Sequence, residues 1–134
     1  MESTQAIQDV KEKTFPAIVV NVIDSCKLAI NRGKIHALKE GQRLLVYRLS
    51  IQEIQDPNTG ESLGYLEIVK GTGRVIHLQE KMCTIESDRK RSRQRVNKPN
   101  KLSVSYLFGE DVIETFDELI PFEEPEIGDM VKPI

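Results

Sequence analysis

The stretch that decides the fold runs from residue 43 to residue 70 and has the sequence RLLVYRLSIQEIQDPNTGESLGYLEIVK. Segments rich in β-branched and aromatic residues, expected as strands over 43–49, 51–54 and 63–70, flank a cluster of turn residues. In that cluster Pro57 fixes φ and Gly60 tolerates a positive φ, so the chain is predicted to reverse there. These residues therefore predict a β-hairpin.

The same pattern of short apolar runs and turn residues continues on both sides of this hairpin. It predicts further strands over 17–23, 27–31, 74–79 and 82–86, a tight turn at 24–25 and one short helical turn within 35–40. The Gly71-Thr72-Gly73 sequence is interpreted as strand punctuation or a bulge. Because closure removes exposed strand edges, residues 15–87 are expected to form an all-β, five- or six-stranded barrel of the SH3-like or OB-like kind.

Composition narrows the class of protein. The chain has 134 residues and a net charge of −2, which favours one compact domain. No apolar run approaches the roughly 18 residues that a membrane helix needs, and the polar segment 1–14 lacks the core of a signal peptide, so a cytoplasmic protein without a membrane contact is expected. The two cysteines, Cys26 and Cys83, form no CxxC pattern and predict reduced thiols rather than a disulfide or zinc site.

Charge is distributed unevenly beyond residue 87. Residues 88–101 hold seven basic side chains and one acid, with almost nothing to bury, and are expected to form a mobile basic loop. Residues 102–134 hold nine acids and one lysine among many apolar residues, and are expected to form a partly packed acidic extension. Within it, residues 102–108 are a candidate strand and 112–120 a candidate short helix.

The sequences AINRG at 29–33, LKEGQRLLVYR at 38–48, IQDPNTGESLG at 54–64 and GRV at 73–75 resemble the small β-barrel that forms the C-terminal domain of the bacterial flagellar assembly protein T family. The resemblance covers about residues 17–87, and most of its motifs are turn residues. It implies a non-catalytic barrel that serves as an assembly or interaction module in a bacterial protein, and it carries over no catalytic residue.

The basic segment is the one sharp candidate for a binding site. Its side chains could neutralise nucleic-acid phosphates, although an ordinary solvated loop explains the same charges. The acidic extension could compete for this segment and mask it. The residues concerned are Arg89, Lys90, Arg91, Arg93, Arg95, Lys98 and Lys101.

No pattern of residues predicts catalysis, a metal ion or another cofactor. His36 and His77 lie far apart without ligand spacing, and the Asp56-x-Asn58-x-Gly60 sequence suits a turn better than a calcium loop. A nucleophile at Ser25 has no assignable base. We therefore expect a non-enzymatic module that binds a protein partner, or a second copy of itself, through barrel loops or an edge strand. The alternative is a nucleic-acid-binding accessory protein that uses residues 89–101.

Overall fold

The computed structural model of the chain describes residues 14–97 and 112–134. These residues form two compact units. The first contains residues 14–88 and 121–134, and the second contains residues 89–97 and 112–120. The fold is all-β, as the sequence predicts.

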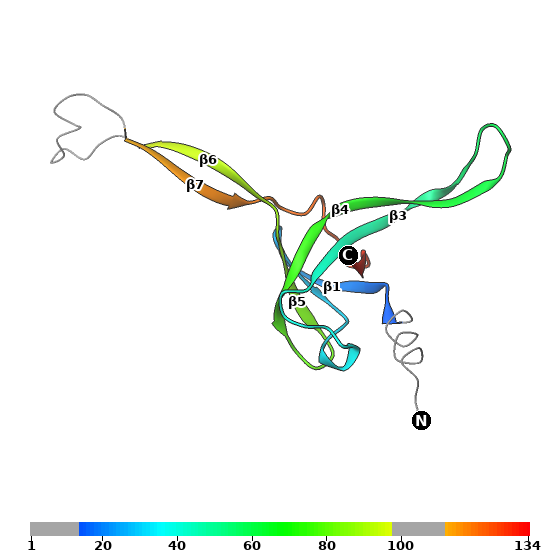
Figure 1. The fold of residues 1–134 in the computed structure, drawn as a ribbon, viewed down its shortest axis with the longest axis horizontal. Helices are drawn as coiled ribbons and strands as arrows, with labels where there is room; N and C mark the ends of the chain where they lie inside the picture. Colours follow the sequence, from blue (N-terminus) through cyan, green and yellow to red (C-terminus); the bar gives the residue numbers. More distant parts are fainter. Residues whose placement is uncertain (1–13, 98–111) are drawn as a thin grey trace. The chain divides into compact units, whose positions relative to one another are not determined.

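The first unit is a closed barrel of six antiparallel strands (Figure 1). Around the barrel the strand order is β1-β2-β5-β4-β3-β8, and every neighbouring pair is antiparallel. A single 3₁₀ turn, η1 (Lys34–His36), lies where a short helical turn was expected. The strands are β1 (Ala17–Asp24), β2 (Lys27–Ile30), β3 (Arg43–Gln55), β4 (Ser62–Leu78), β5 (Cys83–Ser87) and β8 (Met130–Pro133).

Alternating side chains of these strands fill the barrel. Leu28 and Ile30 of β2, Leu44 and Val46 of β3 and Ile85 of β5 are completely buried, and their two-residue spacing is that of one strand face. The other members of the same cluster are Ala17, Val19, Leu38, Val75, Cys83, Phe122 and Val131. Removing this apolar surface from water is the main stabilising term for so small a domain.

The alternation in β4 is interrupted three times, at Leu63 near the turn and at two bulges nearer the barrel. Val46 lies opposite Gly71 and Tyr47 opposite Val69, so Lys70 is an extra residue. In a second irregularity, Val75 lies opposite Ile85 and His77 opposite Thr84, so Ile76 has no partner in β5. The Gly71-Thr72-Gly73 sequence, expected as a break or a bulge, pairs in regular register with β3, and the bulge lies at the preceding residue, Lys70. β4 continues through both as one long strand.

The sixth strand comes from the acidic C-terminal extension, whereas the sequence placed the barrel within residues 15–87. β8 pairs with β1 through Ala17 and with β3 over Leu44–Tyr47. Val131 becomes fully buried there. Four residues are too short a segment for a periodic pattern to identify, and only pairing on both sides defines this strand.

The second unit corrects two expectations. Residues of the expected basic loop form β6 (Lys90–Asn97), and residues of the expected short helix form β7 (Val112–Leu119), paired antiparallel. Cross-strand pairing of arginines with acids offsets the like-charge repulsion that favoured a loop, and β7 contains β-branched residues suited to a strand. Lys98, Lys101 and the candidate strand at 102–108 lie outside the described residues.

Candidate functional site

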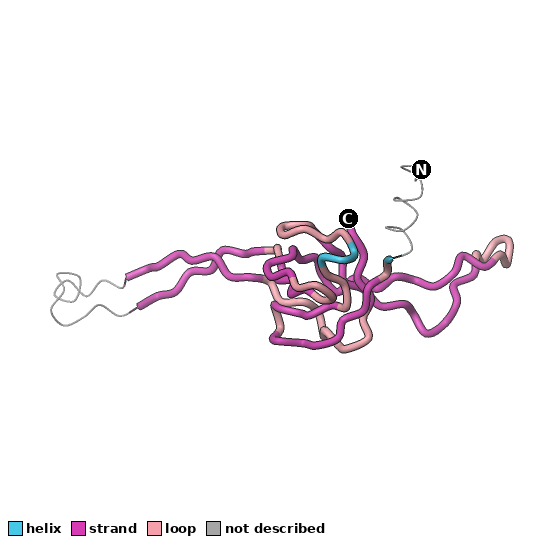
Figure 2. The backbone as a smooth tube through the Cα atoms, turned by 90° about the horizontal axis from the view of Figure 1, so that it is seen from below, coloured by secondary structure: helices cyan, strands magenta, loops and turns pink. Residues whose placement is uncertain are grey.

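The hairpin of β3 and β4 is longer than the barrel, and residues 48–69 project from it as a two-stranded arm (Figure 1, Figure 2). β8 pairs with β3 only up to Tyr47, and β5 pairs with β4 only from Gly73. Within the described parts of the chain, no strand pairs with the outer edges of the arm. Its edges therefore present the backbone groups to which an added strand could bind.

The tip of the arm is the turn that the sequence predicts. The Asn58 amide donates to Asp56 Oδ1 (2.7 Å), and the Gly60 amide donates to the Asp56 carbonyl (2.8 Å). Gly60 has φ of 74°, which suits a residue without a side chain. The Asp56 carboxylate thus stabilises the turn.

A bulge in β3 divides the arm. Leu49 pairs with Glu67 and Glu53 with Tyr65, which leaves residues 50–52 unpaired in register. The Ser50 hydroxyl accepts a hydrogen bond from the Leu66 amide (3.0 Å) and donates one to the Gln52 carbonyl (2.8 Å). Ile51 lies in this bulge with 92% of its surface exposed.

The register assigns the arm side chains to two faces, because directly opposed residues share a face. One face, here called the Tyr65 face, carries Leu49, Tyr65 and Val69 together with Glu53 and Glu67. The other, the Leu66 face, carries Ile54, Leu66 and Ile68 with the single charged residue Arg48.

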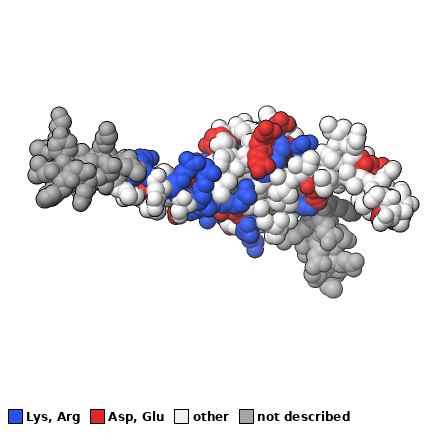
Figure 3. Space-filling view, turned by 90° about the horizontal axis from the view of Figure 1, so that it is seen from above, with Lys and Arg blue, Asp and Glu red and all other residues white. Residues whose placement is uncertain are grey.

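Large apolar side chains are exposed along the whole arm. A two-stranded ribbon is marginally stable in water by itself, and contiguous exposed apolar surface marks interaction sites. In Figure 3 the arm is mostly white with red near its end. The exposed apolar residues of the arm are Leu49, Ile51, Ile54, Leu63, Tyr65, Leu66 and Val69.

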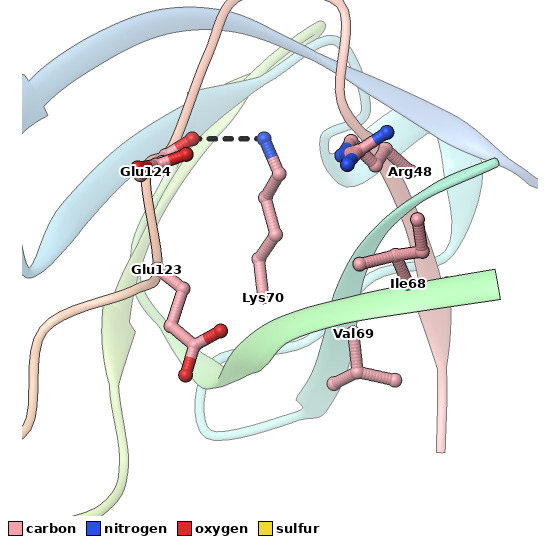
Figure 4. Close-up of a pocket in the computed structure, with 6 residues that line it drawn as sticks. All are labelled: Arg48, Ile68, Val69, Lys70, Glu123 and Glu124. Carbon is pink, nitrogen blue, oxygen red and sulfur yellow. Dashed lines mark hydrogen bonds between the residues drawn. The ribbon is translucent and has the colours of Figure 1, made fainter. Parts of the chain in front are cut away.

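An open pocket of about 430 Å³ lies at the base of the arm (Figure 4). Arg48, Ile68 and Val69 of the arm line one part of it, and Glu123 and Glu124 line another. Between them the Lys70 side chain points toward Glu124 (Figure 4). The pocket therefore combines apolar walls with charges of both signs.

Lys70, which also lines this pocket, forms an ion pair within the protein. Its Nζ donates to Asp129 Oδ2 (2.8 Å) and to the Glu124 carbonyl (2.8 Å), and only 6% of the Lys70 side chain is exposed. Asp129 Oδ2 also accepts from the Glu126 amide (2.8 Å). A buried ion pair with this many hydrogen bonds is a structural anchor for the segment before β8.

Phe122 anchors the same segment from the other end. Its amide donates to the Ser25 carbonyl (2.9 Å), and its ring is buried against Gly71 and Gly73 of β4. A Cβ on Gly71 would lie 2.8 Å from Phe122 Cδ1, and Gly71 has φ of 149°. The two glycines thus make room for this ring, which explains their presence in a strand.

The basic residues predicted as a binding site lie partly in ion pairs. Register places Arg91, Arg93 and Arg95 on one face of the β6–β7 hairpin. Glu118 Oε2 accepts from Arg93 Nε (2.6 Å) and Arg91 Nε (3.4 Å). The Arg95 guanidinium lies 5.1 Å from the centre of the Phe116 ring. The acidic extension therefore does contact the basic segment, as its charge suggests.

Part of the arginine surface on this hairpin is exposed to solvent. Blue side chains gather on it in Figure 3, and half of the Arg93 side chain is exposed despite its ion pair. The described parts of β6 and β7, with residues 89 and 120, hold five basic and three acidic side chains. Pairing lowers the net charge available for phosphates.

Three further residues have side chains that could take part in chemistry, namely Cys83, His36 and Asp24, and the structure gives each of them a structural environment. Burial raises the pKa of the Cys83 thiol to about 12, so this thiol is unreactive. Burial, followed by the charge of Arg32, lowers the pKa of His36, whose Nδ1 accepts from the Gly33 amide (3.0 Å). The Asp24 carboxylate accepts from the Cys26 amide (2.7 Å) and so stabilises the β1–β2 turn.

Residues 14–97 and 112–134 contain no cluster of three or more histidine, cysteine or acidic side chains that could hold a metal ion. Within the same ranges, no helix has the length and apolar character needed to cross a membrane.

The sequence did not single out the arm. It predicts the hairpin, but the expected breaks near residue 50 and at residues 71–73 suggested short strands within a barrel wall. The signal in the sequence was that strand-type segments follow one another almost without interruption over 43–54 and 63–79. The structure joins them into strands of 13 and 17 residues, which are longer than a small barrel uses.

Fold and surface together define a small closed β-barrel that carries an exposed apolar arm. No protein-family model matches the chain, and no curated protein matches it at a significant level.

Proposed function

We propose that this protein is a non-enzymatic interaction module that binds a protein partner through the β3–β4 arm. The observation that carries the proposal is the arm itself, whose edges are unpaired and whose apolar side chains are exposed. Added strands and apolar contacts are the two ways in which such ribbons bind proteins. The resemblance to an assembly-protein barrel points to the same class of function.

Site-specific photo-crosslinking in cells that naturally make the protein tests this proposal. A photoreactive amino acid in place of Ile51 in the arm is expected to give discrete protein adducts. The matched control carries the same amino acid in place of Ile35, an apolar residue of η1 that is 60% exposed. Absence of adducts from the arm, or the same adducts from both positions, would contradict the proposal.

Nucleic-acid binding by the β6–β7 hairpin is the second candidate. Three arginines on one face of the hairpin favour it, and the acids of β7 weaken it. Phosphate binding falls steeply between about 50 and 200 mM salt, so titrations of labelled DNA and RNA at these two concentrations are informative.

Two variants make that titration specific. Replacing Arg91, Arg93 and Arg95 by Gln is expected to abolish binding, whereas Lys34→Gln with Lys39→Gln on the barrel leaves it unchanged. Glu118→Gln, which frees two arginines, is expected to raise the affinity at low salt. If none of these variants changes the affinity for DNA or RNA, the hairpin is not a nucleic-acid site.

A further inference from the structure

The arm and its base are acidic. Residues 48–69 contain four acidic residues and one basic residue, and two exposed acids of the pocket, Glu123 and Glu124, lie at the base. One acid of the arm, Glu67, is neutralised by Lys132 Nζ (2.5 Å). The surface as a whole therefore carries a net negative charge. Among the described residues, the charges of this surface that no ion pair neutralises are Glu53, Asp56, Glu61, Glu123 and Glu124 against Arg48.

These acids form two groups. Three of them lie at or near the tip of the arm, where red side chains are visible in Figure 3. The other two lie at the base, where the Glu123 amide donates to the Lys70 carbonyl of β4 (2.8 Å). At about 3.3 Å per residue the arm is roughly 20 Å long, more than twice the Debye length of about 8 Å at physiological salt. Each group of acids thus attracts a countercharge by itself.

The pocket at the base suits the side chain of a lysine or an arginine. Ile68 and Val69 provide an apolar wall for the aliphatic part of such a side chain, and the two glutamates can accept hydrogen bonds from its charged end (Figure 4). Lys70 does not oppose a cation, because Asp129 Oδ2 lies 2.8 Å from its Nζ. Arg48 is the one opposing charge of the pocket, and the two carboxylates outnumber it.

The backbone of β4 offers a pairing edge beside this pocket. The Leu66 amide donates to Ser50 Oγ of β3 (3.0 Å), so the adjacent residues Tyr65 and Glu67 direct their backbone groups to the outer edge. The bulge at residues 50–52 interrupts the edge of β3, whereas β4 has no extra residue in this part of the arm. An added strand is therefore expected to pair with β4.

We infer that the partner of the arm is a basic protein segment in an extended conformation, which pairs with the edge of β4 and places a lysine or arginine side chain beside Glu123 and Glu124; this inference rests on the proposed function. Apolar side chains of the segment pack against the exposed apolar residues of the arm, and further basic residues meet the acids at the tip. Such electrostatic complementarity selects the partner and speeds association. A second arm is disfavoured as the occupant, because two negatively charged surfaces repel each other.

Two fluorescent peptides that differ only in charge test the inference on the full chain. The basic peptide has the sequence Lys-Arg-Val-Thr-Val-Thr-Val-Arg-Lys, whose centre favours a strand, and the control peptide has glutamate in place of every lysine and arginine. Anisotropy titrations are expected to detect binding of the basic peptide only. Its dissociation constant is expected to rise severalfold between about 50 and 200 mM salt, because salt screens exposed charge pairs.

Two double variants locate the binding site. Replacing Glu123 and Glu124 by Gln is expected to raise the dissociation constant of the basic peptide about fivefold, the effect of losing one or two exposed ion pairs. The matched control, Glu40→Gln with Glu80→Gln, removes the same charge from exposed positions of the barrel unit and leaves the constant unchanged. Hydrogen exchange of the outward-facing amides of β4 is expected to slow when the peptide is bound. Thermal unfolding checks that each variant is folded.

The outcomes separate the inference from the function on which it rests. Equal binding of both peptides, binding of neither, or binding that Glu123→Gln with Glu124→Gln leaves unchanged overturns the inference. If a photoreactive residue at Ile51 then still crosslinks to a protein, the arm is an interaction surface and only a basic extended partner is excluded. Failure of the basic peptide together with an absence of adducts contradicts both.

Discussion

At the scale of single residues, Lys70 links the base of the arm to the segment that precedes β8. It is the extra residue of the β4 bulge, and the bulge directs its ammonium toward Asp129 instead of solvent. Both side chains are about 95% buried, so neither can exchange its partner for water. Their contact fixes the segment from which β8 begins.

Replacing Lys70 by Met is expected to destabilise the protein by about 3–5 kcal/mol, because it leaves the Asp129 carboxylate buried without a countercharge. Urea denaturation measures this free energy of unfolding. Lys132→Met is the matched control, since the Lys132 pair with Glu67 is exposed and such pairs contribute about 0–1 kcal/mol. Equal losses in the two variants would show that the Lys70 contact is no stronger than a surface pair.

Asp88 makes stability depend on pH. Burial raises its pKa, but hydrogen bonds from Thr72 Oγ1 (2.5 Å) and Arg43 Nε (2.6 Å), together with the Arg43 charge, outweigh burial and leave the pKa below its ordinary value. A depressed pKa in the folded state stabilises the protein above the unfolded-state pKa of about 3.9. This contribution is lost as the pH falls through the folded-state pKa.

The variant Asp88→Asn isolates that contribution. We expect it to be less stable than the original chain at neutral pH, and we expect the difference to shrink as the pH falls below about 4. Thermal unfolding of both proteins at several pH values gives the comparison. A difference that persists unchanged into strong acid would indicate that the Asp88 charge contributes nothing.

At the scale of elements, β8 closes the barrel. It supplies four residues and pairs on both sides, with β1 and with β3. Without it, both neighbours would become exposed edges and Val131 would leave the core. A short strand thus determines whether this sheet is open or closed.

Truncation after Ile127 is therefore expected to abolish cooperative unfolding and to promote aggregation. The dispersion of amide signals in an NMR spectrum, together with thermal unfolding, measures this loss. Removing Ile134 alone, a residue that is 59% exposed, is the control and should preserve both. A truncated chain that still unfolds cooperatively would mean that five strands suffice.

At the scale of the whole molecule, the described chain divides into two units with different roles in stability. Every residue of the buried core belongs to residues 14–88 or 121–134. The β6–β7 hairpin starts and ends at one place, since the Ile120 amide donates to the Arg89 carbonyl (2.8 Å). The hairpin is thus an insertion between β5 and β8.

Replacing residues 90–119 by a short glycine linker is expected to leave the barrel folded, with a melting temperature close to that of the original chain. The physical reason is that the described residues of this segment, 90–97 and 112–119, contribute no side chain to the core. Thermal unfolding and amide dispersion check the result. A barrel that fails to fold after this deletion would show that the hairpin is part of one cooperative unit.

Sequence patterns by themselves determined the all-β class, the reversal at Asp56–Gly60 and most strands of the barrel, because alternation and turn residues act locally. They did not determine β8, the β6–β7 pairing or the arm. A loop was expected where Arg93 pairs with Glu118, since repulsion along the chain is visible in a sequence and attraction across strands is not. The exposure of Ile51 likewise depends on where the barrel ends. Only the tertiary structure decides these features, because they arise from contacts between residues far apart in the chain.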